Sequence, residues 1–171
     1  MKNITLVVAI IVCCAANVGA QDISGLDFYL QDINGEDQSF HQYLSGRGTS
    51  DRTSGKGIVV IAFWGLCKAC QQEMKALRRL HDQYSHKNLR ILAININNIR
   101  SVAKVKSYVT AHKLPYDVWL DPVNDVFKKF NGQAVPYTLI IDSNGKVILK
   151  HHGFTAGDEK KFVRIITDEL E

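Results

Sequence analysis

The segment from Ile58 to Met74 reads IVVIAFWGLCKACQQEM, and it carries the clearest structural signal in the 171-residue chain. Its first part, Ile58 to Phe63, is a continuous apolar run, which is typical of a strand buried on both faces. From Lys68 to His86, apolar residues recur every three or four positions between charged and polar ones, which predicts an amphipathic helix. Cys67 and Cys70 therefore lie where a buried strand turns into a helix.

A cysteine at the start of a helix is well placed for thiol chemistry. Thiol–disulfide exchange needs a thiolate, and a helix amino-terminus stabilises one through its partial positive charge and its unpaired N–H groups. Cys67 has this position, and Lys68 beside it adds positive charge. We interpret Cys67 as the nucleophile and Cys70, one turn further along, as the residue that resolves the mixed disulfide.

The first twenty residues differ from the rest of the chain. Lys2 precedes the apolar run Ile4 to Ala16, and small residues follow before Gln21, which predicts a signal peptide over residues 1–20 and an exported mature chain. An uncleaved amino-terminal anchor is one alternative. Lipidation of Cys13 or Cys14 is another, although bulky residues precede both. Without this segment only Cys67 and Cys70 remain, and a pair so close cannot close a long loop, which favours chemistry over scaffolding.

Composition and length indicate one soluble domain. The chain is 46% hydrophobic and 22% charged, and we assign residues 21–171 to a single domain with a flexible loop at 45–57. The net charge of +4 falls to +3 once Lys2 is removed, which is too weak to indicate a nucleic-acid partner. We expect a monomer that binds no nucleic acid.

The pattern of elements predicts an α/β fold with a central mixed sheet flanked by helices. The expected strands are 26–30, 58–63, 89–96, 116–120, 137–141 and 146–150, the last two forming a hairpin around 142–145. The expected helices are 68–86, 101–112 with Ser101 as its cap, a short one starting at Asp121-Pro122 and ending at Phe130, and 158–170. Before the first central strand, a turn at 33–36 and residues 39–44 suggest a small hairpin-like extension.

Residues 63–74, FWGLCKACQQEM, resemble the active-site segment of the thioredoxin superfamily, specifically of its exported TlpA/ResA-like branch. Residues 26–28 with Asn34-Gly35 resemble the lead-in of that branch, and residues 135–142 with 144–146 resemble its cis-proline strand and hairpin. The resemblance covers nearly all of the mature chain. It implies a thioredoxin fold with an amino-terminal hairpin-like extension, and thiol–disulfide oxidoreductase activity in the reducing direction.

The resemblance also implies that the Val135–Pro136 bond is cis, faces the cysteines, and places the Val135 backbone for pairing with an extended substrate. Pro136 opens a strand that otherwise has a buried pattern, where proline needs a special role, although an ordinary trans proline is the alternative. The branch usually has Trp before the first cysteine and often Pro before the second, whereas this chain has Leu66 and Ala69. We take Trp64, Leu66, Lys68 and Ala69 as candidate substrate contacts, while Trp64 and Phe63 are equally suited to the core.

Two further features allow opposing interpretations. Glu73 lies one helical turn after Cys70 and is a possible proton shuttle, but an exposed surface glutamate is the interpretation we favour. Thioredoxin has a buried acid on the strand before the motif, and residues 58–63 contain none. His151-His152 invites comparison with the copper sites of SCO-like relatives, but we interpret it as a solvated strand end and expect no metal.

The sequence therefore predicts an exported enzyme whose redox-active Cys67–Cys70 disulfide needs no other cofactor. The expected partners are cysteine-containing exported proteins and a membrane-embedded electron donor, in the periplasm or another exported location, with a membrane tether if the amino-terminal segment stays uncleaved. One alternative is a thioredoxin-fold metallochaperone or binding module. Another is a peroxidase of the related peroxiredoxin branch, whose turn carries a Pro, a Thr and a single Cys where this chain has CxxC.

Overall fold

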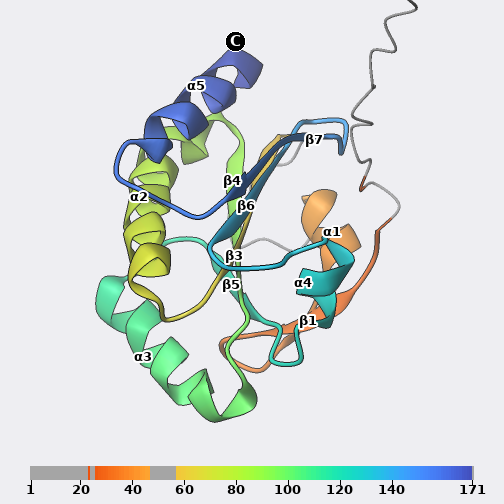
Figure 1. Ribbon diagram of the computed structural model, residues 1–171. Helices are drawn as coiled ribbons and strands as arrows, with labels where there is room; N and C mark the ends of the chain where they lie inside the picture. Colours follow the sequence, from red (N-terminus) through yellow and green to blue (C-terminus); the bar gives the residue numbers. More distant parts are fainter. Residues whose placement is uncertain (1–22, 24–25, 47–56, 171) are drawn as a thin grey trace, which may run out of the picture.

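Seven strands form one mixed sheet in the computed structural model, which describes residues 23, 26–46 and 57–170 (Figure 1). Their order across the sheet is β2-β1-β5-β4-β3-β6-β7. The central strand β3 pairs parallel with β4 and antiparallel with β6, so the predicted mixed sheet is confirmed. The bounds are β1 Tyr29–Asp32, β2 Asp37–Ser39, β3 Ile58–Trp64, β4 Leu89–Asn95, β5 Asp117–Leu120, β6 Tyr137–Ile141 and β7 Val147–His152. The predicted signal peptide and most of the predicted loop at 45–57 lie outside the described residues.

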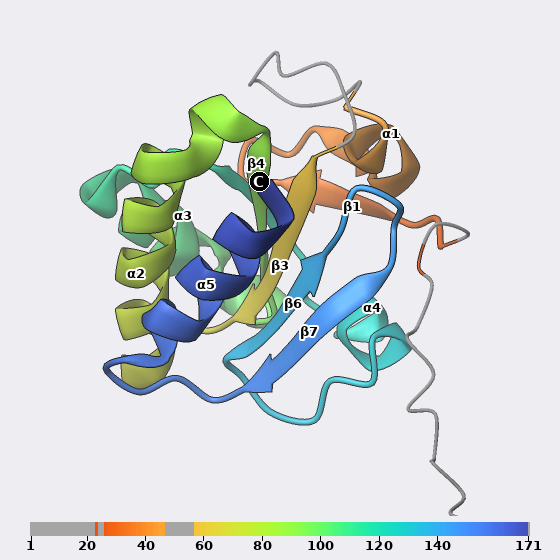
Figure 2. The ribbon, with the colours of Figure 1, turned by 90° about the horizontal axis from the view of Figure 1, so that it is seen from above.

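Helices cover both faces of the sheet (Figure 2). One face packs against α2, α3 and α5, and the other against α1 and α4. Their bounds are α1 Phe40–Leu44, α2 Lys68–Tyr84, α3 Val102–His112, α4 Asp125–Lys129 and α5 Asp158–Leu170, with short 3-10 turns η1 Ser85–Lys87 and η2 Ile99–Ser101. Within the described residues, no helix is long and apolar enough to cross a bilayer.

The position of β3 between two layers of helices explains why its sequence is apolar at every position. Val60, Ala62 and Trp64 join the core beneath α2, α3 and α5. The alternate residues Ile61 and Phe63 join the core beneath α1 and α4. Since successive side chains of a strand point to opposite faces, a central strand covered on both sides must be apolar throughout.

The amino-terminal extension is a hairpin, but its boundaries differ from the expected ones. The first strand, β1, runs over Tyr29–Asp32 rather than 26–30, and it pairs antiparallel with β2. Residues 39–44 do not form one element, because the Ser39 hydroxyl accepts the Gln42 N–H at 3.3 Å and starts α1 there. The hairpin joins the main sheet through an antiparallel pairing of β1 with β5.

Two expected helix starts differ in detail from the structure. Ser101 is the N-cap residue of α3, as predicted, but its hydroxyl makes no capping bond and donates instead to Asn98 Oδ1 at 3.4 Å. The helix expected from Asp121-Pro122 begins only at Asp125. The fully buried Asp121 carboxylate nevertheless caps this helix, because it accepts the N–H groups of Asp125 at 3.1 Å and Phe127 at 2.8 Å.

Candidate active site

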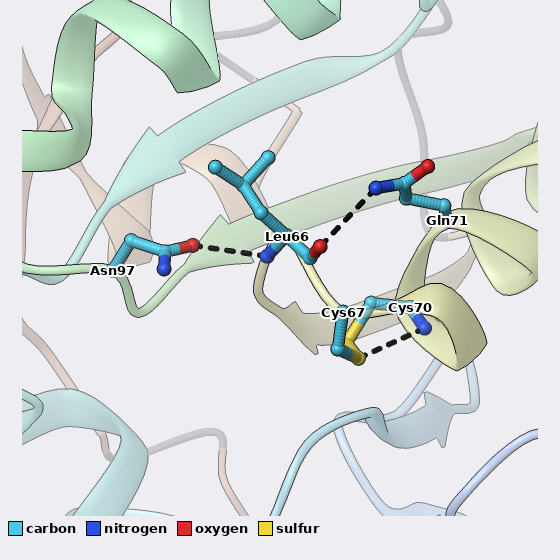
Figure 3. Close-up of a disulfide and its surroundings, with 5 residues drawn as sticks. All are labelled: Leu66, Cys67, Cys70, Gln71 and Asn97. Atoms are coloured by element: carbon cyan, nitrogen blue, oxygen red, sulfur yellow. Dashed lines mark hydrogen bonds between the residues drawn. A yellow bond between two sulfur atoms is a disulfide. The ribbon is translucent and has the colours of Figure 1, made fainter.

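Cys67 and Cys70 form a disulfide at the amino-terminal end of α2 (Figure 3). Cys67 is the N-cap residue of the helix, and its Sγ accepts the Cys70 N–H at 3.1 Å. Cys67 is exposed, whereas Cys70 is fully buried. An incoming sulfur can therefore reach Cys67 and not Cys70, and a thiolate formed at Cys67 would face the unpaired N–H groups of the helix end.

The residue before Cys67 is held through both of its backbone polar groups (Figure 3). The Leu66 N–H donates to Asn97 Oδ1 at 3.1 Å, and the Leu66 carbonyl accepts Gln71 Nε2 at 3.1 Å. Asn97 is oriented in turn, because its own N–H donates to Asn95 Oδ1 at 3.0 Å. This arrangement fixes the backbone that leads into the nucleophile.

Sequence reasoning missed Asn97 and Gln71. A signal was available for Asn97, because it follows β4, the parallel neighbour of β3, and the carboxyl ends of parallel strands meet at one edge of a sheet. No comparable signal identifies Gln71. Its neighbour Gln72 is also polar, and only the tertiary structure shows which of the two turns back toward Leu66.

We expect Gln71→Ala to slow the reaction of Cys67 with a small disulfide by about fivefold, because one hydrogen bond that orients the loop is worth about 1 kcal/mol. Gln72→Ala is the matched control, since it is the same substitution at the adjacent, exposed position of the same helix. Single-turnover kinetics of the reduced protein measure both rates. Equal rates for the two variants would show that the bond to the Leu66 carbonyl does not position the nucleophile.

The Val135–Pro136 segment lies beside the cysteine loop, and its peptide bond is cis, the isomer that the resemblance implies. A Cβ placed on Gly65 would lie 3.7 Å from Cγ2 of Val135 and 3.4 Å from Asn97 Oδ1. Pro136 is buried and Val135 is half-buried. The chain thus brings together two segments that are about seventy residues apart in the sequence.

The candidate substrate contacts divide by exposure. Lys68 is exposed, and Leu66 and Ala69 are half-buried, so all three border the surface around Cys67. Of the two roles considered for Trp64, the substrate contact is wrong and the core position is right. Trp64 is fully buried and packs against Tyr108, with ring centroids 5.4 Å apart. It is still paired within β3, where the alternation of side chains directs it into the core beneath α2 and α3. Phe63 is buried as well, on the opposite face.

Glu73 is not a surface residue, which corrects the favoured interpretation. It is fully buried, and burial raises the pKa of its carboxyl group to about 8. The Thr138 hydroxyl donates to Oε1 at 2.8 Å, while Oε2 has no hydrogen-bond partner among the described residues. The helical period contained the signal, since Glu73 lies three residues after buried Cys70 and four before buried Leu77, within the apolar stripe of α2.

The histidine pair ends β7, as predicted, but only His152 is exposed, whereas His151 is half-buried. Both residues lie within β7, and adjacent residues of a strand point to opposite faces. The His151 ring packs on Phe162 and its Nε2 lies 3.3 Å from Asp158 Oδ2, whereas the His152 ring stacks on Tyr137 at 4.3 Å. Across residues 23, 26–46 and 57–170, no three His, Cys, Asp or Glu side chains gather as a metal site would require.

A central strand is followed by an exposed cysteine that caps a helix, and a cis-proline segment lies beside the loop between them. These features define this chain as a thioredoxin-fold protein with a dithiol–disulfide site. Residues 25–150 match the model of the AhpC/TSA family. The chain belongs to that family.

Its relatives carry names that agree with such a site. The chain is 26% identical over 156 residues to the thiol-disulfide oxidoreductase ResA of Halalkalibacterium halodurans, covering 90% of this chain and 80% of the relative. It is 30% identical over 122 residues to ResA of Geobacillus kaustophilus, covering 71% and 63% of the two chains. A solved structure assigned as the thiol:disulfide interchange protein DsbE of Chlorobium tepidum superposes with a TM-score of 0.73 at 21% identity, over 90% of this chain and 99% of that one. The named relatives support an oxidoreductase, and the superposition supports the fold.

Proposed function

We propose that this protein is a thiol–disulfide oxidoreductase that reduces disulfides of exported proteins through Cys67 and Cys70. One observation carries the proposal: an exposed cysteine at a helix amino-terminus is disulfide-bonded to a buried cysteine one turn later. In this arrangement the exposed sulfur can meet the substrate, while the buried sulfur stays out of its reach. The names of the ResA relatives support thiol–disulfide oxidoreductase activity.

The proposed reaction begins with the dithiol form. The Cys67 thiolate attacks one sulfur of the substrate disulfide, so that a mixed disulfide forms and the other substrate sulfur leaves as a thiolate, which takes up a proton. Cys70 then loses its proton and attacks the Cys67 sulfur. This step releases the second substrate thiol and forms the Cys67–Cys70 disulfide seen here. Two electrons and two protons pass from the protein to its substrate.

Glu73 is our candidate for the proton shuttle of the second step. Cys70 is buried, so the proton that leaves its thiol needs an acceptor within the protein interior. Glu73 lies on the next turn of the same buried helix face, and its pKa of about 8 is close to that of an ordinary thiol. A carboxyl group with a matched pKa can take up that proton and return it without a large energetic cost.

The surroundings of Cys67 supply the substrate-binding roles. We assign the pairing with an extended substrate to the backbone of Val135, which precedes Pro136 next to the cysteine loop. Leu66, Lys68 and Ala69 border Cys67 and would contact residues on either side of the substrate cysteine. Trp64 takes no part in binding, because it has no exposed surface.

The setting of the reaction follows from the amino-terminal sequence and the chemistry. Residues 1–20 have the pattern of a signal peptide, so we place the protein in the periplasm or another exported location, with a tether if that segment remains. The disulfide formed in each cycle must be reduced again, and we propose a membrane-embedded dithiol donor for this step. We propose a monomer that binds neither metal nor nucleic acid.

The redox potential of the Cys67–Cys70 couple tests this function. The protein is equilibrated in dithiothreitol or glutathione buffers, with Cys67→Ser as the control that cannot form the disulfide. We expect a reversible two-electron couple near or below about −270 mV, the value of thioredoxin, whereas a value near −120 mV would make the protein an oxidant. Absence of a reversible couple would contradict the proposal and leave metal binding as the next function to test. Rapid consumption of hydrogen peroxide would instead support the peroxidase alternative.

A further inference from the structure

A shallow apolar groove lies on the surface at the end of the sheet that carries the cysteines. Its cavity has a volume of about 230 Å³. Two of the residues that line it, Gln31 and Asp37, are polar, and the others are apolar: Tyr29, Leu30, Ile99, Val102, Leu120 and Pro122. Among the described residues, three large apolar side chains are strongly exposed: Tyr29 and Ile99 at 70% each, and Val123 at 65%. Two of the three face this one groove, and apolar surface concentrated in this way marks a binding site more often than scattered single residues do.

A row of paired residues across the sheet connects the cysteine loop with the groove. Trp64, the last residue of β3, pairs with Asn95 of β4, which pairs with Leu120 of β5, which pairs with Gln31 of β1. The row therefore runs from the residue before the cysteine loop to the strand that forms the far wall of the groove. In Figure 1 the end of β3, the start of α2 and the strand β1 all lie toward the lower end of the sheet.

The loops that separate the groove from the cysteines are held by side chains. Asn97 bonds to Leu66 on the cysteine side, and Ile99, two residues later, enters the groove. The side-chain amide of Asn124 is assigned with its nitrogen toward two backbone carbonyl oxygens. In this orientation it donates to the Ile96 carbonyl at 2.9 Å and to the Asp121 carbonyl at 3.1 Å. The loops after β4 and β5 are thus tied to each other and to the active-site backbone, so the groove and Cys67 keep a fixed spacing.

We propose that this groove binds a large apolar side chain of the substrate polypeptide, four or five residues away from the cysteine that Cys67 attacks. This inference rests on the proposed function, because it assigns a second contact to the same substrate. The occupant is an extended or unfolded segment of an exported protein. Such a segment has its apolar residues accessible, whereas a folded domain would not present both its disulfide and a core residue to one edge of the sheet.

Elementary distances set the spacing of the two contacts. Three strand intervals separate β3 from β1, and at about 4.8 Å each they span about 14 Å. An extended chain advances about 3.3 Å per residue, so four to five residues cover that distance. The protein would therefore prefer substrates with a Leu, Ile, Phe or Tyr at this spacing, on the side of the cysteine that runs toward β1.

The test compares peptides that carry one cysteine as a mixed disulfide with 5-thio-2-nitrobenzoate. In one set Leu stands four or five residues before or after the cysteine, and in the matched set Ser replaces it. Reduced full-length protein reacts with each peptide and, separately, with the small reagent 5,5′-dithiobis(2-nitrobenzoate). The variants are Ile99→Ser and Tyr29→Ser, and Val123→Ser is the matched control, being similarly exposed but outside the groove lining.

For the unsubstituted protein we expect a Leu peptide on one side of the cysteine to react about tenfold faster than its Ser counterpart. Ile99→Ser and Tyr29→Ser should each remove most of this preference, and Val123→Ser should retain it. All variants should reduce the small reagent equally fast.

A Leu-to-Ser ratio near one, or a ratio that survives both groove substitutions, would overturn the inference while leaving the proposed function intact. Failure of the dithiol form to reduce even the small reagent would reject the function and the groove together. A dimer in sedimentation that Ile99→Ser dissociates would assign the groove to a second copy and overturn the inference.

Discussion

Cys70→Ser is expected to stop the reaction at the mixed disulfide, so that the protein stays covalently bound to its substrate through Cys67. The exposed sulfur can still attack, but no second thiol remains to displace the substrate. Cys67→Ser is expected to lower disulfide reduction by roughly three orders of magnitude, because a hydroxyl group does not form the anion that a thiol forms readily. The two variants should thus fail at different steps.

Non-reducing electrophoresis and intact mass spectrometry distinguish these failures. Incubation of Cys70→Ser with a disulfide-containing protein should produce one adduct per chain, which dithiothreitol removes. Cys67→Ser is the control, since its remaining cysteine of the pair is fully buried and should form no adduct. Equal adduct formation by both variants would mean that the roles of the two cysteines are not distinguished by burial.

Glu73→Gln is expected to make the oxidised protein more stable than its parent in alkaline solution, and to have little effect in acid. The folded protein holds Glu73 with a pKa of about 8, against an ordinary value of 4.5, because burial disfavours the charged form. Below pH 4.5 the group is neutral in the folded and the unfolded chain. As the pH rises from 4.5 to 8 the unfolded chain loses this proton first, so its free energy falls relative to the folded state and stability declines.

The difference between the two pKa values sets the size of the effect, at most about 5 kcal/mol between pH 4.5 and pH 9. Glutamine keeps the shape of the side chain and an oxygen that can accept the Thr138 hydroxyl, but it does not ionise. Urea denaturation of both proteins at pH 5, 7 and 9 measures the divergence. Glu169→Gln, at an exposed position of α5, is the matched control and should follow the parent at every pH. Parallel stability curves for Glu73→Gln and the parent would refute a buried neutral carboxyl at this site.

The same variant reports on catalysis. If Glu73 takes the proton of Cys70, its loss should slow release of the substrate from the mixed disulfide while leaving the first attack by Cys67 unchanged. Rapid mixing experiments separate the two steps, because only the first consumes the substrate disulfide. A purely structural role for Glu73 would affect neither step once both proteins are folded.

Local pattern was sufficient to predict the sheet, most of its elements and the two cysteines. The apolar run of Ile58 to Phe63 and the helical period after Lys68 are properties of neighbouring residues, and the junction between them places Cys67 at a helix end whatever surrounds it. The missing capping bond at Ser101 and the wrong helix start at Asp121 also have a local origin. A cap depends on where a side chain points, and the Asp121 carboxylate reaches four and six residues ahead.

The sequence by itself therefore determined the fold class and the redox pair, because strand and helix periods and the CxxC spacing are short-range properties of the chain. Only the tertiary structure decided that Glu73 is buried beneath Thr138, that Trp64 faces the core, and that Asn97 holds Leu66. Each of these facts depends on which face of one element packs against another that is distant in sequence. Such packing is settled by burial of the whole core, which no window of neighbouring residues contains.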